Sequence, residues 1–136
     1  MLMTGILNPQ INSLLARVRH TNTLVIADRG FPFWPMIETV DISLVDGIPT
    51  VLEVLQAVRS NFEIGEIWMA QEFITTNTAD VCEAFANAAV GVPLHYEAHV
   101  DLKRRVSGAI GLIRTGDAIQ YANMILVSGP VEPSPG

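Results

Sequence analysis

The sequence is poor in cysteine and in basic residues, and both shortages exclude classes of function. Its 136 residues contain one cysteine, Cys82, so an internal disulfide is impossible and a reducing cytoplasm is the expected compartment. Cys82 falls within a helical pattern, where we expect a buried structural role rather than a nucleophile. Eight lysines and arginines face fourteen aspartates and glutamates, which gives a formal net charge of −6. Because sequence-independent nucleic-acid binding depends on neutralising phosphates, this balance argues against a nucleic-acid partner.

Motifs that mark several common classes of protein are also missing. The chain has no glycine-rich phosphate loop, no Gly-x-Ser-x-Gly elbow and no His-Glu-x-x-His pair. It has no run of about 18 apolar residues that could cross a bilayer, and residues 1–7 do not resemble a secretory signal. The three histidines, His20, His95 and His99, lack the spacing of a metal site. We therefore expect neither a metal nor a membrane partner.

The composition favours one folded domain. Apolar residues make up 49% of the chain and charged residues only 16%, which suits a buried sheet rather than a disordered chain. Such a composition also favours an oligomer, because it leaves apolar surface to cover. We expect the domain to span residues 1–129 and the proline-rich residues 130–136 to form a tail.

Helical and extended patterns alternate along the chain. Apolar spacing and capping residues predict four helices. The first is opened by Asn8-Pro9 and ends near His20, the second begins at Pro49, the third runs from Thr78 to Gly91, and the fourth begins near His99. Strands are predicted at residues 23–27, 37–44, 64–70, 94–97, 111–114 and 121–127. This alternation predicts a single α/β domain in three layers, α/β/α, around a mostly parallel, mixed sheet.

Polar residues at the ends of these elements are the candidates for chemistry. His20 lies where the first helix is expected to stop, and Asp28 follows the strand at 23–27, where ligands bind in open α/β sheets. His99 follows another strand, and Tyr121 and Asn123 begin the last one. Each has a structural alternative: His20 could satisfy helix-end carbonyls, Asp28 could form a turn, and Tyr121 could simply pack. The pattern alone leaves these alternatives open.

Several short motifs occur in a familiar order. They are Arg19-His20-Thr21-Asn22-Thr23-Leu24-Val25, Asp28-Arg29-Gly30-Phe31-Pro32, Asp46-Gly47-Ile48-Pro49, Ile113-Arg114-Thr115-Gly116-Asp117 and Tyr121-Ala122-Asn123. In order and spacing, from about Met3 to Gly129, the chain resembles the D-ribose pyranase and L-fucose mutarotase family. The resemblance implies a ribose pyranase-like fold and an isomerase that interconverts cyclic forms of a monosaccharide without a metal or organic cofactor. It also implies a cytoplasmic homo-oligomer, a pentameric ring or a decamer, with the sugar held between neighbouring subunits.

The resemblance further implies a role for each candidate residue. His20 would be the catalytic acid/base, and the sugar hydroxyls would be held by Asp28, His99, Tyr121 and Asn123. Asp28 could instead orient the imidazole. An imidazole, with an ordinary pKa of about 6.5, can take and return the protons that sugar ring opening moves near neutral pH.

The choice of sugar depends on a few positions. His99 and the Tyr121-Ala122-Asn123 segment resemble the ribose branch of the family, so conversion of β-D-ribopyranose to β-D-ribofuranose is the expected reaction. Departures from the ribose pattern occur at Asn22, Arg29, Phe31 and Phe33-Trp34. They keep two alternatives open: a mutarotase for L-fucose or another sugar, and a non-catalytic sugar-binding protein of the same fold.

Overall fold

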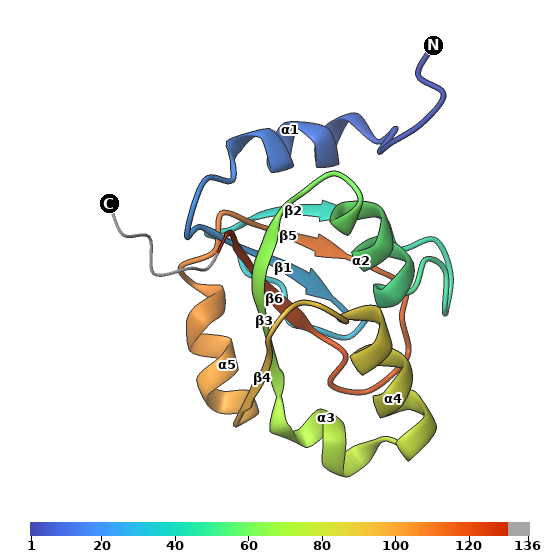
Figure 1. The fold of residues 1–136 in the computed structure, drawn as a ribbon, viewed down its shortest axis with the longest axis vertical. Helices are drawn as coiled ribbons and strands as arrows, with labels where there is room; N and C mark the ends of the chain where they lie inside the picture. Colours follow the sequence, from blue (N-terminus) through green and yellow to red (C-terminus); the bar gives the residue numbers. More distant parts are fainter. Residues whose placement is uncertain (131–136) are drawn as a thin grey trace.

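The computed structural model describes residues 1–130, and its elements follow the predicted alternation (Figure 1). The strands are β1 (Thr23–Ala27), β2 (Glu38–Asp41), β3 (Ile64–Ala70), β4 (Leu94–Glu97), β5 (Gly111–Arg114) and β6 (Met124–Ser128). The helices are α1 (Pro9–Arg17), α2 (Val51–Arg59), α3 (Gln71–Thr76), α4 (Ala79–Ala88) and α5 (His99–Val106). The predicted tail lies, apart from its first residue, outside the described residues. Among residues 1–130, no helix has the length and apolarity needed to cross a membrane.

The strands form one six-stranded mixed sheet in the order β2-β5-β1-β6-β3-β4. β5 pairs in parallel with both β1 and β2, and β3 pairs in parallel with β4. β6 is antiparallel to both of its neighbours, β1 and β3. The prediction of a mostly parallel, mixed sheet is therefore confirmed. Because β6 runs antiparallel, its amino end lies beside the carboxyl ends of β1 and β3, and Ile26 faces Met124.

Helices cover both faces of the sheet, which confirms the three-layer prediction. In Figure 1, α5 lies on the opposite side of the sheet from α2 and α4. The larger core packs the sheet against Leu14 of α1, Leu55 of α2 and Phe85 of α4. The smaller core packs the other face against Leu102 and Val106 of α5.

Side-chain caps explain where several helices begin. Asn8 accepts a hydrogen bond from a backbone N–H in the first turn of α1 at 2.9 Å, with proline as the first helical residue. Thr50 and Glu53 form a reciprocal capping box at the start of α2, so this helix begins after Pro49 rather than at it. Thr78 caps α4 as expected.

Other boundaries differ from the prediction. α1 ends at Arg17 rather than near His20, because Val18 is already extended at φ −83° and ψ 122°. The strand expected at residues 37–44 is shortened to β2. The short helix α3 was not predicted, since it follows β3 directly and no side chain caps its start.

The last strand begins at Met124 rather than at residue 121. Tyr121 lies in the left-handed region, at φ 58°, a conformation that a strand does not accommodate. Tyr121 and Asn123 therefore belong to the loop that enters β6, and the prediction that they begin the strand was wrong. This loop lies beside the residues that follow β1.

Candidate active site

A pocket of about 310 Å³ lies at the carboxyl end of β1, beside the start of β6. It is lined by Asp28, Gly30, Phe31, Pro32, His99, Gln120, Tyr121 and Asn123. These residues come from three segments far apart in the sequence: the loop after β1, the start of α5 and the loop before β6. The structure thus brings together four of the predicted residues, Asp28, His99, Tyr121 and Asn123, and leaves His20 elsewhere.

Asp28 is the buried charge of this pocket, with 9% of its surface exposed. Its Oδ1 accepts the backbone N–H of Gly30 at 3.0 Å, so the turn considered as a structural alternative is present as well. Burial raises the pKa of the Asp28 carboxyl above its ordinary value. Hydrogen bonds from Gly30, Phe31 and Asn123 oppose that rise, and the nearby charge of Asp117 adds to it.

Asn123 joins two of the segments that line the pocket. It is 3% exposed, and its Oδ1 accepts the backbone N–H of Asp28 at 2.7 Å. Its side chain also hydrogen-bonds the Asp28 carboxyl, which lowers the pKa of that group. The loop before β6 is therefore fixed to the end of β1 at this pair of residues.

His99, the first residue of α5, is held from several sides. Its ring makes edge-to-face contacts with Phe31 and Tyr121, with centroid distances of 6.4 Å and 5.2 Å. Its backbone N–H donates to Oε1 of Glu72 at 2.9 Å, and its buried Nδ1 has no hydrogen-bond partner among residues 1–130. Glu72 is not among the predicted site residues, because it lies in the unpredicted helix α3 and belongs to no motif. The aromatic contacts fix the plane of the imidazole at the edge of the pocket.

The Arg114-Thr115-Gly116-Asp117 motif supports the pocket without lining it. Thr115 donates from Oγ1 to the carbonyl of Ala27 at 2.8 Å. The buried Asp117 carboxylate accepts the backbone N–H groups of Val51, at the start of α2, and of Ile119, both at 2.9 Å. A Cβ on Gly116 would lie 2.5 Å from the carbonyl oxygen of Ile48, which leaves room for glycine alone. The motif fastens the end of β1 to α2 and to the turn before it.

His20 lies at the opposite end of β1, exposed in the turn that follows α1. Asn22 closes this turn by accepting the backbone N–H of Arg19 at 2.9 Å, and Thr21 adopts the left-handed region at φ 69°. β1 has 5 residues and at about 3.3 Å per residue spans roughly 16 Å. His20 therefore does not reach the pocket of its own chain. Since α1 ends three residues earlier, His20 also lacks the helix-end position on which the capping alternative depended.

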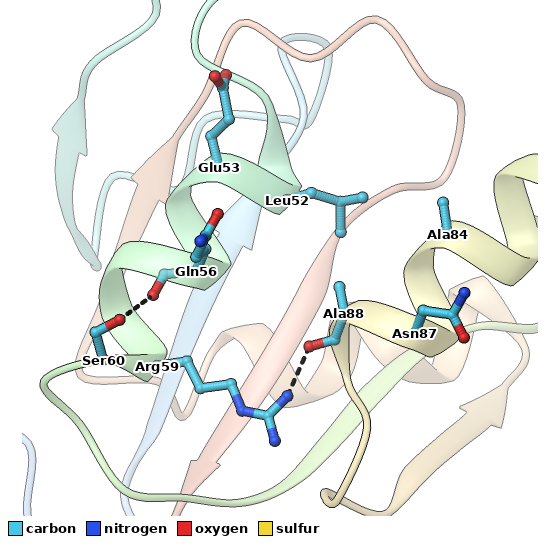
Figure 2. Close-up of a pocket in the computed structure, with 8 residues that line it drawn as sticks. All are labelled: Leu52, Glu53, Gln56, Arg59, Ser60, Ala84, Asn87 and Ala88. Carbon is cyan, nitrogen blue, oxygen red and sulfur yellow. Dashed lines mark hydrogen bonds between the residues drawn. The ribbon is translucent and has the colours of Figure 1, made fainter.

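A larger cavity, of about 580 Å³, lies between α2 and α4 (Figure 2). Arg59 crosses from α2 and donates from Nη1 to the carbonyl of Ala88 at 2.7 Å, as the dashed line in Figure 2 marks. None of the predicted site residues lines this groove. Cys82 of α4 is half-buried against the larger core rather than fully buried, and it too lies outside the pocket. The candidate active site is therefore the smaller pocket.

The fold and the pocket are typical of α/β proteins that bind a small ligand at the end of the sheet. The pocket lies at the carboxyl end of a strand in an α/β sheet, and it offers a carboxylate, an imidazole, a phenol and an amide to a small polyhydroxyl ligand. Over residues 1–131 the chain matches the RbsD / FucU transport protein family. The chain belongs to this family.

Curated relatives agree with the family over nearly their whole length. The chain is 42% identical over 125 residues to the D-ribose pyranase of Geobacillus thermodenitrificans, covering 92% of this chain and 94% of the relative. It is 43% identical over 126 residues to the D-ribose pyranase of Geobacillus kaustophilus, covering 93% and 92%. By this relationship the chain is an enzyme of the sugar isomerase and mutarotase type.

Solved structures show the same fold. The Bacillus subtilis RbsD complexed with D-ribose has a TM-score of 0.87 and 29% identity, covering 95% of this chain and 98% of that chain. The fucose mutarotase of Streptococcus pneumoniae in complex with L-fucose has a TM-score of 0.75 and 19% identity, covering 92% and 94%. The second likeness is one of fold alone.

Proposed function

We propose that this enzyme is a D-ribose pyranase that interconverts β-D-ribopyranose and β-D-ribofuranose by opening and reclosing the sugar ring. The observation that carries the proposal is the meeting of Asp28, His99, Tyr121 and Asn123 in one pocket. Its volume of about 310 Å³ lies at the lower end of the roughly 300–1,000 Å³ typical of small-ligand sites, which suits a monosaccharide. The D-ribose pyranases among its relatives support the choice of sugar. We further propose that it works in the cytoplasm, where its single Cys82 has no need of an internal partner.

The hydrogen bonds already made inside the pocket indicate what each group can offer a sugar. The Asp28 carboxylate accepts hydrogen bonds from Gly30, Phe31 and Asn123, and because an ionised carboxylate has about four lone-pair sites it can still accept a sugar hydroxyl. Oδ1 of Asn123 accepts from Asp28, which leaves its NH₂ group as the better donor. The Tyr121 hydroxyl can donate or accept. Together these groups supply both the donors and the acceptors that sugar hydroxyls need for hydrogen bonding.

The proposed reaction needs a group that moves protons. A base removes the proton of the anomeric hydroxyl while an acid protonates the ring oxygen, and the open-chain aldehyde recloses through a different hydroxyl. We propose His20 as this acid/base, because an imidazole, with an ordinary pKa of about 6.5, exchanges protons near neutral pH. A positioned acid/base typically contributes ~10²–10⁴-fold to a rate.

The separation of His20 from the pocket leads to a composite site. We propose that His20 acts in the pocket of a neighbouring copy, in a homo-oligomer such as a pentameric ring or a decamer. A contact between the two different ends of the sheet closes into a ring when it repeats around an axis. Large apolar residues are exposed in the loops that follow β1 and β2, which an ion pair between Arg29 and Asp46 connects, and they would be covered in such an assembly: Phe33, Leu44, Val45 and Ile48.

NMR exchange spectroscopy on D-ribose tests the activity. With the protein present, exchange between pyranose and furanose signals should be faster than in buffer, and a panel that includes L-fucose should show the largest acceleration for ribose. Exchange at the buffer rate for every sugar would overturn the proposal. Calorimetric binding of ribose without faster exchange would instead indicate a non-catalytic sugar-binding protein.

Subunit complementation tests the composite site. His20→Ala and Asp28→Asn should each be nearly inactive alone. When the two variants are co-expressed, about a quarter of the interfaces in a randomly mixed assembly pair an intact His20 with an intact Asp28, so activity should return to that fraction. Failure to recover activity in mixed oligomers would contradict a site shared between copies.

A mutarotase for L-fucose is the second candidate, and Phe31 is the observation that favours it. Phe31 lines the pocket, is 5% exposed and contacts the ring of His99. Its apolar surface can pack against the methyl group that fucose carries and ribose lacks. A larger acceleration of anomer exchange for L-fucose than for ribose would make this the better assignment.

A further inference from the structure

Arg114 ends β5 and turns its side chain toward the loop that carries Asp28. Its Nη1 donates to the carbonyl oxygens of Asp28 and Arg29, both at 3.3 Å. Its Nη2 donates to the carbonyl oxygen of Pro32 at 3.4 Å. The guanidinium of Arg114 therefore donates hydrogen bonds to three of the five main-chain carbonyls in the loop at 28–32.

The remaining contacts of Arg114 are weaker. Its Nε lies 3.9 Å from Oδ2 of Asp41, at the end of β2, and the Asp41 side chain is 54% exposed while that of Arg114 is 11% exposed. Such an exposed partner at that distance contributes little to stability. The guanidinium is thus held mainly by the loop carbonyls, and its planar fork of donors suits several acceptors at once.

The same loop forms one wall of the pocket. Gly30, Phe31 and Pro32 line it together with Asp28, whereas Arg114 does not. One backbone N–H of the loop, that of Arg29, donates to the carbonyl of Asp117 at 2.9 Å. The backbone carbonyls of the loop are held by Arg114.

We propose that Arg114 is a positioning residue for the sugar reaction: it holds the loop at 28–32 in the shape that presents Asp28 and Phe31 to the sugar, and it does so without touching the sugar. This inference rests on the proposed function. Without Arg114 the loop samples open shapes, and the apparent affinity falls by the fraction of molecules whose loop is closed. Once sugar is bound, the closed shape is restored, so the turnover at saturation changes little.

The test compares Arg114→Met, which keeps most of the length and loses every donor, with Arg114→Lys, which keeps the charge. The matched control is Arg17→Met, since Arg17 binds Glu38 on the surface with N–O distances of 2.9 and 2.7 Å, away from the pocket. Exchange rates measured over a range of ribose concentrations give KM and kcat separately. Arg114→Met should raise KM about tenfold or more with kcat within about threefold, Arg114→Lys should lie between it and the wild type, and Arg17→Met should match the wild type.

Amide hydrogen exchange supplies a readout that does not depend on activity. The Arg29 and Gly30 amides should lose protection in Arg114→Met while amides in α2 and β6 keep theirs. Unchanged KM with unchanged protection would overturn the inference, as would a fall in kcat at constant KM. If wild-type protein leaves ribose exchange at the buffer rate, the proposed function fails, and the amides still decide whether Arg114 holds the loop. If Arg114→Met does not fold, Arg114→Lys carries both measurements.

Discussion

The two ends of β1 are built on different principles. At its carboxyl end, Asp28 is buried and hydrogen-bonded through both its main chain and its side chain. At its amino end, His20 is exposed on a turn closed by a hydrogen bond from Arg19 to Asn22. Asp28 keeps a defined geometry because several neighbours enclose it, whereas His20, which in the proposed composite site reaches the pocket of another copy, is supported only by the turn on which it lies. Substitutions at the amino end of β1 should therefore lower activity with little change in stability, whereas substitutions at the carboxyl end should also change stability.

Of the substitutions at the two ends, His20→Ala should have the largest effect on activity. Loss of the proposed acid/base should lower the accelerated exchange by ~10²-fold or more, while the thermal midpoint stays within error because the side chain is exposed. His95→Ala is the matched control, since His95 stacks on Trp68 and does not line the pocket. NMR exchange and thermal unfolding measure the two effects, and an active His20→Ala protein would remove the proposed role.

Asp117→Ala should show the opposite pattern, a loss of stability at the carboxyl end. The change leaves the buried N–H of Val51 and the partly buried N–H of Ile119 without their acceptor, and an unsatisfied buried group costs ~1–3 kcal/mol. Urea unfolding should therefore show a loss of about 2–4 kcal/mol. Asp46→Ala, which removes an exposed ion pair with Arg29, should change the free energy of unfolding by less than about 1 kcal/mol. Equal effects of the two changes would contradict the anchoring role.

Asp28→Asn should separate function from stability within one residue. Removing the charge should leave the protein nearly inactive, with ribose bound about tenfold or more weakly, since hydrogen bonds to charged groups are worth ~1.5–3 kcal/mol. The folded-state pKa of Asp28 is raised by burial, so the folded protein binds this proton more tightly than the unfolded chain does. Wild-type stability is therefore reduced as the pH rises through that pKa, and the neutral variant should be the more stable protein at pH 7–8.

The gap between Asp28→Asn and the wild type should close as the pH falls toward the unfolded-state pKa, because wild-type Asp28 then becomes neutral as well. Urea unfolding at several pH values measures this gap. Asp41→Asn, at an exposed carboxylate, should show no such pH-dependent gain. A variant less stable than wild type at pH 8 would show that the Asp28 charge stabilises the fold.

Asn22→Asp should have the smallest effect. An aspartate keeps the oxygen that accepts the Arg19 N–H, so the free energy of unfolding should change by less than about 0.5 kcal/mol and exchange should stay within a few-fold. Asn22→Ala removes the acceptor and should cost about 1 kcal/mol. Thermal unfolding compares the two, and a larger loss in Asn22→Asp would mean that the turn depends on the amide donor.

Local patterns predicted most of the fold because its causes are local. The apolar run at residues 23–27 and the caps at Asn8 and Thr78 depend on neighbouring residues, and the structure reproduces them. Local patterns could not decide whether the candidate residues at element ends have a functional or a structural role, and only the resemblance favoured the functional role. In the structure four of these residues, Asp28, His99, Tyr121 and Asn123, line one pocket.

Features that depend on contacts between distant parts of the chain were not predictable. The left-handed conformation of Tyr121, the hydrogen bond from His99 to Glu72 and the reach of Arg114 to the loop after β1 all arise from tertiary packing. The contact of Arg114 depends on β5 lying next to β1, a strand order that no local pattern contains. The separation of His20 from Asp28, in contrast, follows from a local pattern, because the correctly predicted strand at residues 23–27 lies between them.

The hydrogen bonds from Arg114 to the main chain of the loop at 28–32 affect how the substrate range can evolve. Because Arg114 binds carbonyl oxygens, which every residue type carries, the shape of the loop is insulated from changes in the loop's own side chains. Substitutions at Phe31 can then alter what the pocket wall presents to a sugar while the main chain of the loop keeps its shape. Laboratory selection for new monosaccharides should accordingly accumulate changes at Phe31 and spare Arg114.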